Sequence, residues 1–174
     1  YKNAKIIYCP PYTILNYFVI KTRKTNLDVG AQNCHYEINT GPYTGSISST
    51  MIKKLGAKYV IIGHSENRSN GETNTQINKK IHSAILSNLN VIFCIGENLF
   101  EKRTKKTNKI LKQQIDLGLK KIKKSDKIIF AYEPVWSIGT GKVLTNKELT
   151  KQVIIIKKII KNKFKNQKIK IIYG

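Results

Sequence analysis

The sequence has no long apolar segment. Its longest unbroken apolar runs, Val91–Ile95 and Ile128–Tyr132, have only five residues each in a chain of 174, whereas a transmembrane helix needs about 20. The first ten residues, YKNAKIIYCP, contain no apolar stretch of signal-peptide length. The pattern therefore does not indicate membrane insertion or secretion, and we expect a cytoplasmic protein, with an organelle such as a plastid as the alternative.

Acidic residues are scarce. Ten Asp and Glu stand against 32 Lys and Arg, which gives a formal net charge of +22 and raises nucleic acid as a partner. However, Lys, Ile and Asn make up 73 of the 174 residues, and because all three have A/T-rich codons, genomic base composition can produce the lysine excess. The lysines are scattered, and their densest run, Lys120–Lys127, lies where a helix should end and cations are favoured. A basic nucleic-acid-binding domain is therefore the weaker interpretation.

Cysteine is also rare. The three cysteines, Cys9, Cys34 and Cys94, include no C-x-x-C pair, so we expect reduced, buried thiols rather than a disulfide framework. No set of His, Cys, Asp and Glu has the spacing of a metal site.

What the sequence does contain is an alternation of short apolar runs and longer amphipathic stretches. Apolar residues at Leu149, Val153, Ile156, Ile160 and Phe164 share one helical face, and Thr145 with Glu148 forms a capping box before them. Similar stripes join Leu111 to Ile122 and Ile77 to Ile85. The β-branched runs between the helices predict buried parallel strands, at Lys5–Cys9, Leu27–Gln32, Tyr59–Ile62, Val91–Ile95, Ile128–Tyr132 and Ile169–Tyr173. Six strands and five helical segments indicate an α/β fold, and both a doubly wound sheet and a (β/α)8 barrel fit.

The residues that could carry chemistry follow the strands, where parallel α/β folds place their active sites. Glu133 comes directly after Ile128–Tyr132. A carboxylate at a dry barrel mouth has its charged form disfavoured and its basicity raised, which suits removal of a proton next to a carbonyl. The alternative is a strand-end Glu paired with Lys or Arg.

His64 follows Tyr59–Ile62 and precedes Ser65, a possible N-cap. The helix dipole there opposes protonation of the imidazole, and a neutral His can donate a hydrogen bond to a carbonyl oxygen. A lone histidine at a strand end is, however, more often structural.

The segment Pro134–Lys142 has the composition of a lid. Pro134 stiffens one end, while Gly139 and Gly141 free the other and let backbone N–H groups approach an anion. An ordinary loop is the alternative. Glu66 and Glu97 also end strands, and we expect ion pairs with Lys or Arg for both.

Together these segments resemble the triosephosphate isomerase family. AYEPVWSIGTGK (Ala131–Lys142) looks like its catalytic-base and lid segment, and YVIIGHSENR (Tyr59–Arg68) like its electrophilic-histidine segment. Gln32–Ser48 resembles the interface loop, CIGE (Cys94–Glu97) a strand-end motif, and Ile171–Gly174 the start of a phosphate-contacting loop. The order is collinear over essentially the whole chain.

The resemblance implies one (β/α)8 barrel domain over residues 1–174 and the isomerisation of dihydroxyacetone phosphate to D-glyceraldehyde 3-phosphate through an enediol, in glycolysis and gluconeogenesis. Glu133 would move the proton, neutral His64 would polarise the carbonyl, and Gly139 would offer its N–H to the phosphate. No cofactor or metal is implied. Supporting or lid roles would fall to Glu66, Glu97, Pro134, Trp136, Ile138, Gly141 and Lys142.

The resemblance also implies a homodimer, with the loop Asn39–Ser46 reaching the neighbouring subunit and Thr44 and Gly45 at the interface. Ser46 and Asn67 stand where the family usually has Glu and Arg. Because losing both charges together avoids stranding one of them, we expect a dimer that lacks this ion pair.

The chain departs from the family at both ends. The first and last barrel strands, with the Asn-x-Lys segment and the Gly-Gly phosphate turn, lie outside these 174 residues. We therefore expect an internal fragment, truncated at both ends, whose unpaired edges make it poorly soluble and essentially inactive alone. A non-catalytic truncated paralogue and a different barrel enzyme acting on a phosphorylated sugar are the alternatives.

Overall fold

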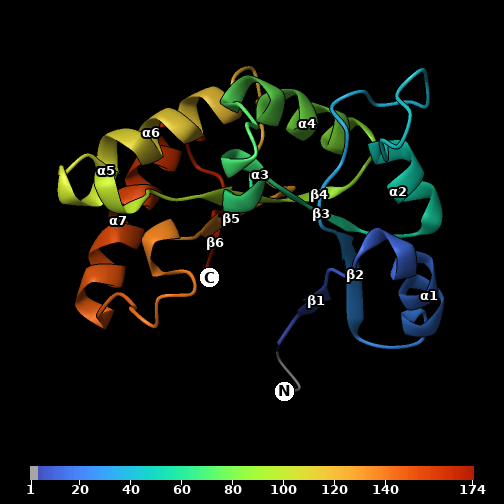
Figure 1. The fold of residues 1–174 in the computed structure, drawn as a ribbon, viewed down its shortest axis with the longest axis horizontal. Coiled ribbons are helices and arrows are strands. Elements are labelled where there is room, and N and C mark those ends of the chain that lie inside the picture. Colours follow the sequence, from blue (N-terminus) through green and yellow to red (C-terminus); the bar gives the residue numbers. More distant parts are fainter. Residues whose placement is uncertain (1–3) are drawn as a thin grey trace. The chain divides into compact units, whose positions relative to one another are not determined.

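The six apolar runs form six strands, as expected. In the computed structural model, which describes residues 4–174, the strands lie in one sheet in the order β1-β2-β3-β4-β5-β6 (Figure 1). The pairs β1–β2, β2–β3 and β5–β6 are parallel. The strands are β1 (Ile6–Tyr8), β2 (Leu27–Ala31), β3 (Tyr59–Ile62), β4 (Asn90–Ile95), β5 (Ile128–Tyr132) and β6 (Lys170–Tyr173).

One or two α-helices lie in each of the five segments between strands. These helices are α1 (Tyr12–Thr22), α2 (Ser49–Leu55), α3 (Ser65–Ser69), α4 (Asn74–Leu86), α5 (Leu99–Arg103), α6 (Thr107–Gly118) and α7 (Asn146–Lys163), with a short 3-10 helix, η1 (Val135–Ser137), after β5. A doubly wound sheet reverses its strand order at a switch point. The order here follows the chain without reversal, so the barrel topology is the one adopted.

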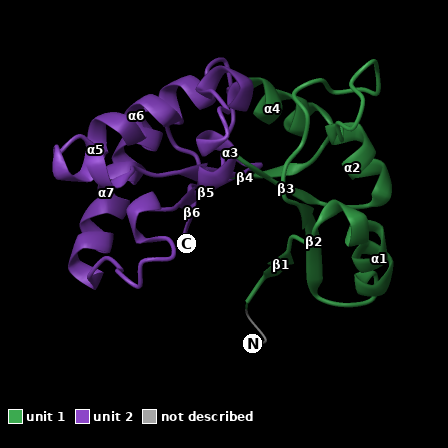
Figure 2. Ribbon diagram, viewed as in Figure 1, with its two compact units in different colours: residues 1–62, 79–92 green, residues 63–78, 93–174 purple. Residues whose placement is uncertain are grey.

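The chain divides into two compact units (Figure 2). Unit 1 takes in the described chain up to Ile62 together with Lys79–Ile92, and unit 2 takes in Gly63–Asn78 and Phe93–Gly174. Unit 1 buries Leu15 and Val19 of α1 and Ile52 of α2. The expectation of a single barrel domain over residues 1–174 stays a prediction.

Unit 2 has its own aromatic and aliphatic core. Phe93 of β4 packs beside Phe130 of β5, with ring centroids 6.2 Å apart. Gly118 of α6 lies so close to Phe93 that a Cβ there would be 2.6 Å from the ring. The stripe expected on α7 is confirmed by the buried Ile156 and Ile160.

The helix ends predicted from the sequence are confirmed in part. The Thr145–Glu148 capping box is confirmed, since the Thr145 side chain accepts from the Glu148 N–H and Glu148 accepts in return. The apolar stripe predicted from Leu111 to Ile122 is longer than the helix: α6 ends at Gly118, so Ile122 lies beyond it, and the lysine run Lys120–Lys127 begins just after the helix end. Among the described residues, no helix is both long and apolar enough to cross a membrane.

The three cysteines are free, as expected. Cys34 and Cys94 are buried, but Cys9, which the sequence places at the end of the first strand, follows β1 and is only half-buried.

We predict that truncating Leu111 will destabilise unit 2 far more than truncating Leu117 on the same helix. Leu111 is fully buried and Leu117 is 43% exposed. Leu111→Ala should lower the free energy of unfolding by about 2–5 kcal/mol because it leaves a cavity, whereas Leu117→Ala should change it by less than about 1 kcal/mol. Urea denaturation followed by circular dichroism measures both, and equal losses would contradict this packing.

Candidate active site

The candidate catalytic residues belong to unit 2. His64 lies two residues after the end of β3, and Glu133 is the first residue after β5. The turn before His64 requires glycine at position 63, which has φ +77°. A Cβ on Gly63 would also lie 3.0 Å from the Arg68 guanidinium and 3.2 Å from the Cys94 carbonyl oxygen. The turn is therefore packed closely against the end of β4.

Arg68 holds this turn in place. Its Nε donates to the Gly63 carbonyl at 2.7 Å, and its two terminal nitrogens donate to the Cys94 carbonyl and the Asn74 side chain. Burial lowers the pKa of the guanidinium, while the charges of Glu72, Cys94 and Glu133 act in the opposite direction. Arg68 thus ties the His64 turn to the neighbouring strand, and its charge reaches Glu133. We did not single it out from the sequence, although it ends the YVIIGHSENR segment.

The end of β4 positions Glu133 through its backbone. The Glu133 N–H donates to the Ile95 carbonyl at 2.9 Å. A Cβ on Gly96 would lie only 1.7 Å from the Glu133 carbonyl oxygen, so only glycine fits there. The buried side chain of Gln114 from α6 holds Gly96 on both sides, accepting from its N–H and donating to its carbonyl at 2.9 Å each. Gln114 was not anticipated, because a glutamine inside a helical stripe carries no distinctive sequence signal.

The His64 and Glu133 side chains meet directly. His64 Nε2 lies 2.9 Å from Glu133 Oε1, and the Ser65 N–H donates to Glu133 Oε2 at 3.4 Å. The His64 side chain is 31% exposed and that of Glu133 is 13% exposed. The contact between the two side chains is therefore only partly buried.

The hydrogen bonds of His64 indicate its tautomer. His64, and not Ser65 as expected, is the N-cap of α3, and its Nδ1 accepts from the Glu66 N–H at 3.4 Å. An imidazole that accepts at Nδ1 and faces a carboxylate at Nε2 is the neutral form with its proton on Nε2. Glu66 contributes its backbone here; its side chain is 85% exposed, and its carboxylate stays 3.7 Å from Nδ1.

Glu97 is held by neutral donors instead of the expected ion pair. The residue is only 2% exposed. Its carboxylate accepts from Trp136 Nε1 at 2.9 Å and from the Tyr132 hydroxyl at 3.2 Å. Lys102, whose ammonium lies 3.1 Å from the centroid of the Trp136 ring, adds charge attraction from a distance. Glu97 therefore anchors the start of the segment that follows Glu133.

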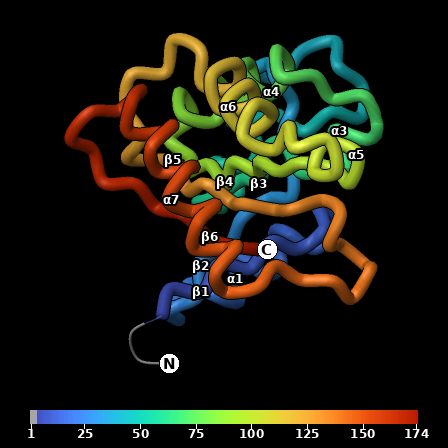
Figure 3. The backbone as a smooth tube through the Cα atoms, turned by 90° about the vertical axis from the view of Figure 1, so that its left-hand side faces the viewer, coloured from blue at the N-terminus to red at the C-terminus, as the bar shows by residue number. Residues whose placement is uncertain are grey.

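That segment leaves the core after Trp136. Pro134 is buried, whereas Ile138, Gly139, Gly141 and Lys142 are exposed. Gly139 and Gly141 have φ +67° and +69°, and a Cβ at either would meet no atom within 4 Å. Figure 3 shows the loop in orange, between β5 and α7, as an open excursion of the chain. Such a loop, anchored at one end and unpacked at its tip, has the properties of a lid.

The two residues expected at the dimer interface lie outside unit 2. Thr44 and Gly45 belong to unit 1, in the loop between β2 and α2. No group of three or more His, Cys, Asp and Glu side chains within residues 4–174 is placed to hold a metal ion.

Comparison with known proteins places this geometry in a family. The family model for triosephosphate isomerase matches residues 1–174. The chain belongs to the triosephosphate isomerase family. It is 40% identical to the triosephosphate isomerase of Clostridium botulinum (strain Langeland) over 99% of this chain and 73% of that protein. It is 42% identical to that of Dictyoglomus thermophilum over 100% of this chain and 72% of that protein.

Solved structures agree. The crystal structure of triosephosphate isomerase from Bartonella henselae superposes with a TM-score of 0.89 and 33% sequence identity, covering 97% of this chain and 69% of that one. The expected α/β barrel fold, represented here by six of its strands, is therefore confirmed. These matches do not favour a nucleic-acid-binding domain.

We predict that Glu97 makes the stability of the protein depend on pH. Burial raises the pKa of Glu97, although hydrogen bonds from Trp136 and Tyr132 partly offset the effect. A raised pKa in the folded state means that the contribution of Glu97 is complete below its unfolded pKa of about 4.3 and is lost as the pH rises through the folded value. The free energy of unfolding of the wild type, relative to Glu97→Gln, should therefore fall as the pH rises from 4 to 7.

Asp28 provides a control of opposite sign. Burial works against its charged form, but the bonds from Lys58 and Lys5 outweigh that and lower the pKa of Asp28. The stability of the wild type relative to Asp28→Asn should therefore fall as the pH drops through the folded pKa of Asp28. Urea titrations carried from neutral pH down to about pH 2, below the ordinary pKa of a carboxyl group, measure both differences, and a Glu97 difference that rises with pH would contradict the assignment.

Proposed function

We propose that this site interconverts dihydroxyacetone phosphate and D-glyceraldehyde 3-phosphate through an enediol or enediolate, with Glu133 as the base and His64 as the electrophile. The 2.9 Å contact between His64 Nε2 and Glu133 Oε1 carries this proposal, because it places a proton acceptor and a hydrogen-bond donor side by side in a chain of the triosephosphate isomerase family.

Glu133 moves the proton. Its carboxylate takes a proton from the carbon next to the carbonyl and returns it to the adjacent carbon, so the net change is internal to the substrate and needs no external oxidant or reductant. The carboxylate suits this task because its backbone is fixed by the Ile95 carbonyl and by the close packing of Gly96. Precise placement matters, since a small displacement of a catalytic group costs much of the rate.

His64 stabilises the developing oxygen charge. With its proton on Nε2, the neutral imidazole donates to the carbonyl oxygen of a substrate that enters beside Glu133. The bond from the Glu66 N–H to Nδ1 fixes this tautomer, and Arg68 fixes the turn that carries it. The arrangement supplies a donor without requiring an imidazolium.

The loop after Trp136 serves as the lid. Its Gly139 N–H binds the substrate phosphate on closure, which excludes water from the enediol. Pro134 and Trp136 form the fixed end of the lid, and Ile138, Gly141 and Lys142 move with it. The positive φ values of Gly139 and Gly141 suit a segment that must change conformation.

We further propose that the protein acts as a homodimer in which the loop Asn39–Ser46 contacts the neighbouring subunit. Tyr43 in this loop packs at a tilt against His35, with ring centroids 4.8 Å apart, which holds the loop to the residues after β2. Thr44 and Gly45 at its tip are exposed within unit 1 and so are available to a partner.

Glu133→Asp should lower kcat by about 100-fold or more with little change in KM, because removing one methylene misplaces the carboxylate without removing it. The measurement is a coupled assay on the chain extended to the length of its relatives, with the 174-residue chain assayed alongside to test its expected inactivity. Asp116→Glu, a change of one methylene in the opposite direction at a half-exposed carboxylate of α6 that pairs with Lys112, is the control and should leave kcat unchanged. Full kcat in Glu133→Asp would remove Glu133 as the base.

Thr44→Glu should dissociate the dimer, because a charge at the tip of the loop would be buried against the partner without a counter-charge. Sedimentation velocity of the same extended chain should show a dimer for the wild type and a monomer for this variant. Asn162→Glu, on the exposed side of α7, adds the same charge outside the loop and should remain dimeric. A monomeric wild type would overturn the dimer proposal.

A further inference from the structure

Unit 2 contains a pocket of about 230 Å³ that Glu97 and Tyr132 help to line. It is lined by the end of α5, the first turns of α6 and α7, and Leu144 at the end of the lid loop. Neither the proposed chemistry nor the family motifs assign a role to it.

Three lysines line this pocket: Lys102, Lys105 and Lys151. Among the described residues, no ion pair involves any of them. The two carboxylates of the pocket are already engaged by other groups. Glu97 accepts from Trp136 and Tyr132, and Glu148 accepts from the N–H and hydroxyl of Thr145. Lys102 is attracted to both carboxylates from a distance, but none of the three lysines forms a direct ion pair with either of them in the described chain.

Neutral donors complete the lining. Thr107 and Asn108 from the first turn of α6 and Gln152 from α7 face the same space. Gln152 donates to Asn108 Oδ1 at 3.2 Å, which ties the two helices together at the pocket. The N-cap of α6, Lys106, makes no side-chain hydrogen bond to the first turn. Because Thr107 and Asn108 of that turn line the pocket, the positive end of the helix dipole lies near it.

The pocket is linked to the lid through Lys102. The Lys102 ammonium lies 3.1 Å from the centroid of the Trp136 ring, and Trp136 in turn donates to Glu97. A cation over an aromatic face is held by the ring quadrupole, but a charged ligand competes strongly for it. An anion in the pocket would therefore draw Lys102 away from Trp136.

We propose that this pocket binds a small phosphate-bearing anion through Lys102, Lys105 and Lys151, and that binding loosens the hold of Lys102 on Trp136 and so regulates the lid. The pocket is smaller than those that enclose drug-sized ligands, which suits a phosphate or diphosphate group. The regulatory part rests on the proposed function of the lid, whereas anion binding stands on the pocket alone.

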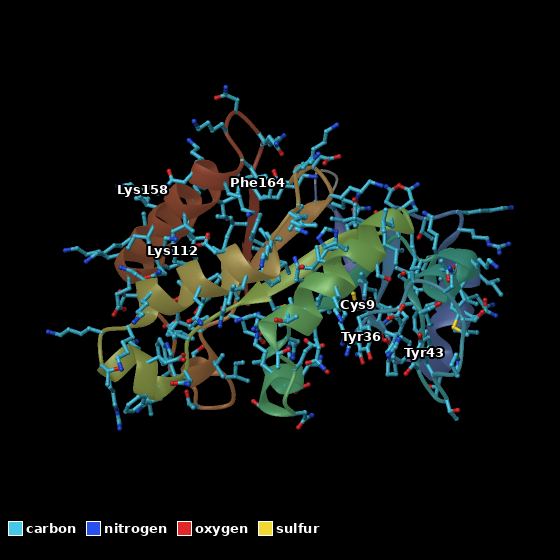
Figure 4. All side chains as sticks on the ribbon, turned by 90° about the horizontal axis from the view of Figure 1, so that it is seen from above. Cys9, Tyr36, Tyr43, Lys112, Lys158 and Phe164 are labelled. Atoms are coloured by element: carbon cyan, nitrogen blue, oxygen red, sulfur yellow. The ribbon has the colours of Figure 1, made fainter. Side chains whose placement is uncertain are left out.

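The only tryptophan in the chain provides the readout. Titration with inorganic pyrophosphate should change the emission of Trp136 in a saturable way, while the same concentration of sodium chloride, matched for ionic strength, should not. The double variant Lys105→Gln/Lys151→Gln should weaken pyrophosphate binding by about 10-fold or more, because each lysine supplies a charge-assisted contact. Lys158→Gln, an exposed lysine of α7 outside the pocket (Figure 4), should change it by less than about 2-fold.

Three outcomes separate the parts of this inference. Equal pyrophosphate binding by the wild type and the double variant would overturn the pocket, as would loss of binding in Lys158→Gln alone. Binding that survives in His64→Gln but is lost in the double variant would support the pocket even if isomerase activity were absent, which keeps it distinct from the proposed function. Circular dichroism of each variant checks that it is folded.

Discussion

The close approach of Gly96 to the backbone of Glu133 is the constraint on which the candidate site depends. A Cβ on residue 96 would lie 1.7 Å from the Glu133 carbonyl oxygen, which is too close for any residue but glycine. The ends of β4 and β5 can therefore approach this closely only because residue 96 is glycine. Gln114 then satisfies both backbone groups of that glycine from α6, so a buried polar turn carries no orphaned donor or acceptor. Glu133 thus leaves β5 from a fixed position, facing His64.

The polar groups around this point form a connected support. Arg68 fixes the turn that carries His64, and Glu97 fixes Trp136 at the start of the proposed lid. In both cases a buried charge is held by several hydrogen bonds rather than by a single opposite charge, which is how burial of a charged group becomes tolerable. The residues that support the site are therefore held by several hydrogen bonds, whereas the tip of the loop after Trp136 makes few contacts.

Much of the fold was readable from the sequence because it rests on local signals. The β-branched runs gave the strands to within a residue or two, and Thr145 with Glu148 marked the start of α7. The strand ends gave His64 and Glu133, and the structure places them in contact. What the sequence left open was the choice between a doubly wound sheet and a barrel, since strand order is a non-local property.

The residues that were missed depend on partners distant in the chain. Gln114 matters through Gly96, 18 positions away, and Lys102 through Trp136. The expected ion pair of Glu97 was wrong for the same reason, because no spacing rule indicates that Tyr132 and Trp136 would supply neutral donors. Lysine is so common here that no single lysine stands out in the sequence.

The glycine at position 96 also limits how this chain can evolve. A/T-rich base composition can raise the number of lysine, isoleucine and asparagine residues at exposed positions, because most substitutions there cost little stability. Glycine codons begin with two G bases, so drift toward A and T works against position 96, yet every replacement there drives a side chain into the Glu133 backbone. Exchanges at exposed positions are therefore tolerated, whereas position 96 must remain glycine.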